Sequence, residues 1–293
     1  MIEIWNNQYG DTDWRLAKIS LIILWFLNIA IILLSYNSAP IKQGIFNWYN
    51  FNFIENPIWR YLILLISFIL TLMYLFEKRM TISTMGMFVI SVFAFTLEES
   101  NGILSRASLL SFVFFAQYLA YFIHKYYPKL DLKQIRFTFS IQAVVAAYML
   151  SAISKLSASS IEWVSNSKYL SLQILKSYHY KFVTYADYKI LKEGIDFASF
   201  VNDNHNIITA LLTISLILEL FAWISLGSKK RAIIYGILLL SMHIGIKLTM
   251  DISLVTISGP MLIFMVNPLF IIWTGILKPF SKKIQDYYIQ IKY

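Results

Sequence analysis

The sequence predicts an all-α integral membrane protein, a bundle of about eight transmembrane helices in a single domain that covers residues 1–293. Of the 293 residues, 58% are hydrophobic and only 14% are charged, whereas a soluble domain carries roughly 25% charged residues. So few charges cannot cover a surface that faces water. The apolar runs are continuous rather than alternating, which favours helices over the strands of a transmembrane barrel.

A helix needs about 20 mostly apolar residues to cross a bilayer. Eight segments of the chain meet this requirement, at residues 17–35, 58–76, 80–97, 104–124, 135–155, 206–227, 231–250 and 252–277. The last segment contains the pairs Gly259-Pro260 and Asn267-Pro268. Because proline cannot continue a regular helix, this segment is predicted to be kinked or partly unwound.

The distribution of basic residues predicts the orientation of these helices. With the N-terminus inside, the inner connections and the C-terminal segment carry most of the lysines and arginines, and the short outer connections carry few. This is the pattern of the positive-inside rule, so both termini are predicted to be cytoplasmic and the expected location is an inner (cytoplasmic) membrane. The net charge of +9 then indicates contact with the anionic headgroups of the lipid bilayer rather than with nucleic acid.

The outer segment 156–205 is too long for a bare loop in a compact domain. Residues 168–181 and 187–200 both mix aliphatic, aromatic and charged side chains. We therefore predict two short interfacial helices there, lying at the outer membrane surface. A partly ordered extracellular loop is the alternative.

Several kinds of chemistry lack the residues that they need. The sequence contains no cysteine, which excludes thiolate nucleophiles and cysteine-bound zinc. The histidines do not have the spacing of metal ligands, and they stand at positions 124, 179, 205 and 243. No metal is expected, and neither a phosphate-binding loop nor a serine nucleophile elbow is present.

Lys155 is the residue that most needs an explanation. It follows the uncharged run 137–154, and a lysine at that depth in a bilayer is costly. The predicted topology brings ionisable residues of other spans to the same outer face, namely Glu98, Glu99, Arg106, His243, Lys247 and Asp251. Glu219 is predicted to lie roughly midway along the sixth span. The sequence thus predicts a group of charges around Lys155.

Two interpretations of these charges are open. In the first, Glu98 and Glu99 neutralise nearby cations and Lys155 extends its ammonium outward to water. In the second, the charges line a polar cavity, where burial would favour the neutral amine of Lys155 and allow it to act as a base. His243 could assist it or form a hydrogen bond between helices. Glu219 could partner His243, pair with another polar group, or remain protonated.

The residues around Lys155 resemble those of a known family. The string from Tyr148 to Leu156, Tyr-Met-Leu-Ser-Ala-Ile-Ser-Lys-Leu, is followed by Trp163. It resembles the lysine motif in the membrane domain of the vitamin K-dependent gamma-carboxylase, whose bacterial relatives are the HTTM (horizontally transferred transmembrane) proteins. Further similarities follow the family's order along about residues 10–280, in the strings at 101–110, 219–222, 242–250 and 266–270.

This resemblance implies a base and a cofactor. In the carboxylase, the lysine deprotonates reduced vitamin K, the quinol takes up oxygen, and the resulting strong base drives carboxylation of glutamate with CO2. Lys155 matches that lysine by position, and His243 matches a histidine of the same pocket. The resemblance therefore implies a reduced quinone as cofactor.

The chain also departs from the family pattern. It ends at Tyr293 without the extramembrane region that captures the protein substrate, and Arg106 stands where the carboxylase has a histidine. If the chain is an enzyme, the expected chemistry is carboxylase-like or quinone-linked, without the region that captures the protein substrate. The alternative is a non-enzymatic accessory protein for maturation or export of a secreted peptide or protein. A transporter is a third possibility, although no inverted repeat is visible.

Overall fold

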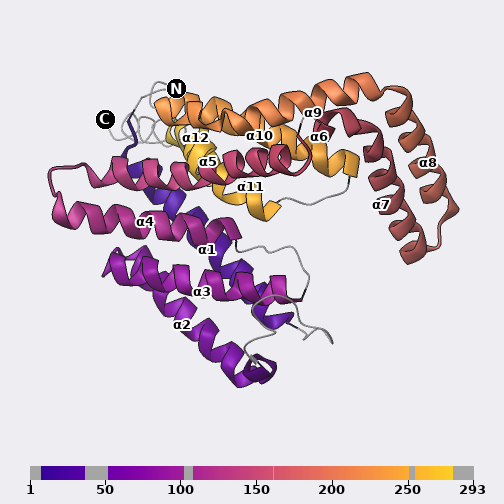
Figure 1. The fold of residues 1–293 in the computed structure, drawn as a ribbon. Helices are drawn as coiled ribbons and strands as arrows, with labels where there is room; N and C mark the ends of the chain where they lie inside the picture. The colour runs from indigo at the N-terminus through magenta and orange to yellow at the C-terminus, as the bar shows by residue number, and fades with distance from the viewer. Residues whose placement is uncertain (1–7, 37–51, 102–107, 161, 251–254, 280–293) are drawn as a thin grey trace, which may run out of the picture.

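The computed structural model describes residues 8–36, 52–101, 108–160, 162–250 and 255–279, and every regular element within them is a helix (Figure 1). Five of these helices are long and apolar enough to cross a membrane. They are α1 (Asp11–Leu34), α2 (Pro57–Leu75), α3 (Met80–Ser100), α5 (Leu132–Ser159) and α10 (Lys229–Met250). The described part of the chain therefore has the character of an α-helical membrane protein.

The other three predicted spans are less regular. Helix α4 (Ser108–Tyr126) contains Gln117, His124 and Lys125, and α9 (His205–Leu220) is followed by the 3-10 helix η5 (Ala222–Gly227). The last span consists of α11 (Val255–Met261), the π-helix η6 (Leu262–Val266), α12 (Pro268–Ile272) and the π-helix η7 (Trp273–Leu277). If its bent pair of helical pieces is one span, the described residues hold up to six spans, so the count of eight remains a prediction.

The kink predicted in the last span lies at Asn267. The helical pieces on its two sides are bent by 40°, and Asn267 has a positive φ of 51°. Its side-chain Nδ2 donates to the backbone oxygen of Asp13 at 2.9 Å, and the Asp13 carboxylate lies 2.6 Å from the Lys229 ammonium. The kink therefore joins the last span to the first turns of α1 and α10.

Helices also occupy the segment 156–205. The short α6 (Glu162–Ser165) and η4 (Asn166–Tyr169) lead into α7 (Leu170–Tyr185) and α8 (Tyr188–Asp203). Helices α7 and α8 pack against each other as a hairpin at one end of α9 (Figure 1), around a small core of Ile174, Ala198 and Val201. The two predicted helical stretches are thus helical, and their position at a membrane surface remains a prediction.

Large aromatic side chains and hydrogen bonds between helices hold the main bundle together. Trp25 of α1 donates to Ser91 of α3 at 2.7 Å. The Tyr74 hydroxyl of α2 donates to Gln117 of α4 at 2.5 Å, and Gln117 donates onward to Ser140 of α5 at 3.0 Å. Because lipid offers these polar groups no alternative partner, such bonds favour association between the helices.

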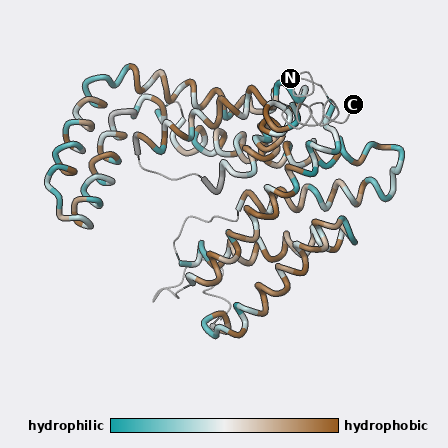
Figure 2. Tube along the Cα trace, turned by 180° about the vertical axis from the view of Figure 1, so that it is seen from behind, coloured by the Kyte–Doolittle hydropathy of each residue, from teal (hydrophilic) through white to brown (hydrophobic). Residues whose placement is uncertain are grey.

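The outside of the bundle is strongly apolar. Helix α2 buries only Ser67, Leu70 and Tyr74, whereas Leu65 is 55% exposed. Figure 2 shows the brown of apolar residues along the long helices, while teal, polar residues gather in the α7–α8 hairpin and near the helix ends. An apolar exterior on helices of this length is compatible with insertion into a membrane.

Candidate functional site

A cavity of about 290 Å³ lies among α4, α5, α9 and α10. Its polar lining consists of Ser108, Tyr148, Ser151, Lys155, Glu219 and His243, and the rest of its wall is apolar. Three of the residues singled out in the sequence, Lys155, Glu219 and His243, therefore meet in one cavity although they are far apart along the chain.

Lys155 and Glu219 form an ion pair across this cavity. The Lys155 ammonium is 2.6 Å from Glu219 Oε1 and 2.5 Å from Oε2, so both carboxylate oxygens accept from it. The Glu219 side chain is 5% exposed and the Lys155 side chain 26% exposed. The ammonium also lies 5.0 Å from the centre of the Trp163 ring, at cation–π distance. Lys155 thus faces a buried carboxylate instead of simply extending to water.

Glu219 stands one residue before the end of α9. The sequence placed Glu219 midway along a continuous span 206–227, but α9 stops at Leu220 and the chain continues as the 3-10 helix η5. Glu219 therefore lies in the last turn of α9, which was not predicted. No proline interrupts residues 206–227, so the chain carries no strong local signal for this break.

A second polar pair lies beside the first. The Tyr148 hydroxyl of α5 and His243 Nε2 of α10 are 2.6 Å apart, and both side chains are buried. His243 Nδ1 has no hydrogen-bond partner among the described residues. Tyr148 precedes Lys155 by seven residues, which is about two helical turns, so both side chains lie on one face of α5. That spacing could have identified Tyr148 from the sequence, where it was overlooked.

The remaining predicted site residues do not line this cavity. Glu98 is buried and Glu99 is exposed near the end of α3, and Lys247 is exposed on α10. Trp163 contacts the cavity only through the Lys155 ammonium described above. Arg106 and Asp251 fall outside the described residues. Of the described ionisable residues predicted to gather at this site, only Lys155, Glu219 and His243 line the cavity.

An apolar cavity of about 380 Å³ adjoins the polar one. It lies mainly between α9 and α10, and Leu211, Leu218, Leu238 and Met242 are among its lining residues. Ile246 of α10 lines both cavities. A ligand with a polar head and an apolar tail could therefore place one part in each.

The polar side chains of this cavity are groups that can take part in proton transfer. Among the described residues, no three His, Asp or Glu side chains are grouped so that they could hold a metal ion. Lys155, Glu219, Tyr148 and His243 can all donate or accept protons. No family model, no curated protein and no solved structure matches the chain.

Proposed function

We propose that the chain is a membrane-embedded enzyme of the HTTM or vitamin K-dependent carboxylase-like type, in which Lys155 takes a proton from a quinol-like substrate in the lipid phase. The observation that carries this proposal is the 290 Å³ cavity in which Lys155, Glu219, Tyr148 and His243 converge. A purely structural ion pair would not require an adjoining cavity with further proton-transfer groups.

The pair with Glu219 supplies a way to free the amine. In this proposal the Glu219 carboxylate, which accepts from the Lys155 ammonium through both oxygens, takes the lysine's proton and leaves a neutral amine. The neutral amine then accepts the proton of a substrate hydroxyl as that O–H bond breaks. The new ammonium stabilises the substrate anion, which carries the electron pair of the broken bond.

The neighbouring groups have supporting roles in this proposal. The Tyr148 hydroxyl and the His243 ring border the same cavity and can hydrogen-bond to a second oxygen of the substrate. The adjoining apolar cavity would hold the hydrocarbon part of the substrate. A quinol has both features, since its ring carries two hydroxyls and its tail is apolar.

The experiment measures quinol oxidation by the purified full chain in lipid nanodiscs, with a short-tailed quinol and dissolved oxygen. Deprotonation accelerates oxidation because the quinolate gives up electrons to oxygen more readily than the quinol does, yielding quinone and hydrogen peroxide. Lys155→Arg retains a positive partner for Glu219, but arginine cannot release its proton. We expect this variant to lose at least about 100-fold in rate, in the range of general-base contributions.

Lys247→Arg is the matched control, because Lys247 is exposed on α10 and does not line the cavity. It should oxidise the quinol like the unchanged chain. Full activity of Lys155→Arg would exclude Lys155 as the base. A lack of any acceleration by the unchanged chain would exclude the quinol as substrate.

A non-enzymatic accessory role is the second candidate, favoured by the α7–α8 hairpin. This hairpin has its own small core and exposes large aromatic side chains, with Tyr180 at 74%, Tyr185 at 69% and Tyr188 at 77%. Such a surface suits capture of a secreted peptide or protein. Replacing residues 170–203 by a short linker would abolish co-purification of the secreted partner with the chain, whereas Lys155→Arg would not. Equal recovery with and without the hairpin would contradict this role.

A further inference from the structure

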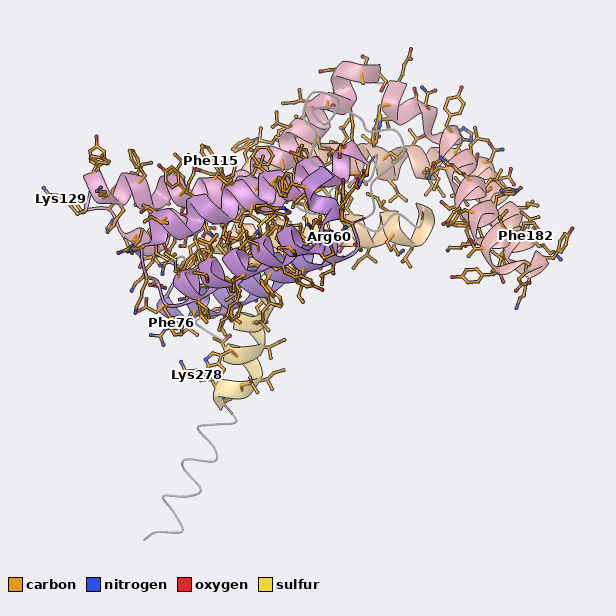
Figure 3. All side chains as sticks on the ribbon, turned by 90° about the horizontal axis from the view of Figure 1, so that it is seen from below. Arg60, Phe76, Phe115, Lys129, Phe182 and Lys278 are labelled. Atoms are coloured by element: carbon orange, nitrogen blue, oxygen red, sulfur yellow. The ribbon has the colours of Figure 1, made fainter. Side chains whose placement is uncertain are left out.

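A second polar cavity, of about 470 Å³, lies at the other end of α5 from Lys155. It is formed by the first turns of α1 and α5 and by the end of α2 with the residues that follow it. Figure 3 labels Phe76, Lys129 and Lys278 toward this end of the molecule and Phe182 of the hairpin toward the opposite end. The basic connections predict that this end faces the cytoplasm.

Four cationic and three anionic side chains line the cavity, and the anionic ones already have partners. Asp131 accepts from the backbone N–H of Lys133 at 2.9 Å and caps α5. Asp11 lies 2.8 Å from the Lys133 ammonium. Glu77 accepts from the Lys18 ammonium at 2.9 Å and from the Trp14 indole N–H at 2.8 Å. The carboxylates are thus occupied within the protein.

Arg136 is the cation whose hydrogen bonds are incomplete. It is only 4% exposed, and its guanidinium lies 3.8 Å from the centre of the Trp14 ring. Its Nη1 is 3.9 Å from Glu77 Oε1, which is too long for a hydrogen bond. Its Nε has no hydrogen-bond partner among the described residues. Arg136 lines the cavity, so an anion held there would lie beside a guanidinium that the nearest carboxylate, Glu77, does not hydrogen-bond.

The surroundings of Arg136 favour a phosphate group over other anions. A guanidinium matches two oxygens of a phosphate with parallel hydrogen bonds. The N-terminal turns of α1 and α5 border the cavity, with Asp11 and Leu132 at their starts. The positive ends of these helix dipoles favour an anion, although Asp131 already accepts from one N–H group of α5. Arg15 is exposed at the rim and adds a second guanidinium.

We propose that this cavity binds a phosphate group, held by Arg136 and Arg15 at the starts of α5 and α1. Leu75 and Phe76 add an apolar edge to the cavity, and anionic lipids are concentrated in the cytoplasmic leaflet that this end is predicted to face. The phosphate can therefore belong to an anionic phospholipid headgroup or to a small soluble phosphate compound. This site is separate from the cavity at Lys155, and its occupation does not depend on the proposed enzymatic activity.

The experiment measures ligand binding to the full chain in detergent by native mass spectrometry and by thermal shift. The probes are dioctanoyl phosphatidylglycerol, a neutral dioctanoyl diacylglycerol and inorganic phosphate. We expect phosphatidylglycerol to bind and the diacylglycerol not to bind. Additional binding of inorganic phosphate would show that the phosphate group suffices, and its failure to bind would assign the site to a lipid.

Arg15→Gln changes an exposed side chain and should leave the fold intact, while weakening phosphatidylglycerol binding at least about 10-fold, the effect of losing one charge-assisted hydrogen bond. Arg136→Lys keeps a buried cation but removes the guanidinium that can form two parallel hydrogen bonds with a phosphate. This variant should weaken phosphatidylglycerol binding at least as much. Lys129→Gln removes an exposed cation at the same end that does not line the cavity, and should bind normally. Equal binding by all three variants, or equal binding of phosphatidylglycerol and diacylglycerol, would overturn the proposal.

Discussion

At the scale of single residues, the pairing of Lys155 with Glu219 gives an expensive lysine a specific partner. The two members of the pair are not equivalent, because the Lys155 side chain is 26% exposed and that of Glu219 only 5%. A lysine left alone can extend its ammonium toward water along its flexible stem. A buried glutamate left alone cannot extend its carboxylate to water in this way. Removing Lys155 and removing Glu219 should therefore lower the stability of the fold by different amounts.

This asymmetry predicts the outcome of a double-mutant cycle. Lys155→Ala leaves Glu219 buried without its partner and should lower the free energy of unfolding by up to about 3–5 kcal/mol, the cost of breaking a buried pair. Glu219→Ala should cost less, about 1 kcal/mol, because Lys155 can still reach water. The double variant should be more stable than the sum of the single changes predicts. Denaturant titration in detergent would measure all three, and simple additivity would contradict a direct interaction.

At the scale of elements, two sharp turns place charged groups near the cytoplasmic end predicted for the bundle. One is the Asn267 kink in the last span, and the other is the turn between α2 and α3. In that turn Glu77 and Arg79 both have positive φ angles, 53° and 47°. Non-glycine residues adopt this conformation at a cost, and here Glu77 gains hydrogen bonds from Lys18 and Trp14.

The Asn267 kink predicts an unusual order of stability. Asn267→Gly removes the hydrogen bond to the Asp13 backbone oxygen but tolerates the positive φ, so it should cost about 1 kcal/mol. Asn267→Ala loses the same bond and also forces a Cβ atom into the left-handed region, which costs roughly 1–2 kcal/mol more. In thermal unfolding, the unchanged chain should have the highest melting temperature, Asn267→Gly a lower one and Asn267→Ala the lowest. An alanine variant as stable as the glycine variant would show that the kink relaxes.

Glu77 predicts a change of stability with pH. Burial, the largest influence, raises its pKa, but the hydrogen bonds from Lys18 and Trp14 and the charges of Lys18 and Arg136 together hold the pKa below the ordinary value of 4.5. A pKa that is lower in the folded chain stabilises it above pH 4.5, and this contribution is lost as the pH falls through the lowered value. The difference in melting temperature between the unchanged chain and Glu77→Gln should narrow below pH 4.5. A constant difference would contradict this effect.

At the scale of the whole molecule, the two cavities lie toward opposite ends of α5. Lys155 stands near the end of that helix, and Arg136 stands in its first turns. If α5 crosses the membrane, the cavity at Lys155 and the cavity at Arg136 lie at different depths of the bilayer. The orientation of the chain in the membrane therefore decides which side of the membrane lies nearer to each cavity.

Cysteine labelling tests that orientation, because the chain has no cysteine of its own. Tyr188 is 77% exposed on the α7–α8 hairpin, and Lys129 is exposed in the connection between α4 and α5. In right-side-out membrane vesicles, a membrane-impermeant maleimide should label Tyr188→Cys at once and Lys129→Cys only after permeabilisation. The reverse pattern would place the N-terminus outside and invert the predicted topology.

The parts of the fold and the site that can be predicted from the sequence are those set by interactions between residues close together along the chain. The apolar runs predict long helices because every buried backbone group in a membrane must be satisfied within its own helix, which is a local requirement. The break after Leu220 was not predicted, since it has no proline to mark it. The pairing of Glu219 with Lys155 joins residues 64 positions apart, and no local sequence signal marks it.

The sequence by itself determined that this protein is built of apolar helices and that Lys155 is a costly residue at the end of an apolar run. Composition and run length are sufficient for these conclusions, because a charge beside a long apolar segment is costly in lipid. Only the tertiary structure decided that the partner is Glu219, that Tyr148 and His243 border the same cavity, and that Arg136 lies incompletely bonded at the other end. The contact between Tyr148 and His243 joins residues 95 positions apart, and the geometry of all these contacts is set by how the helices pack.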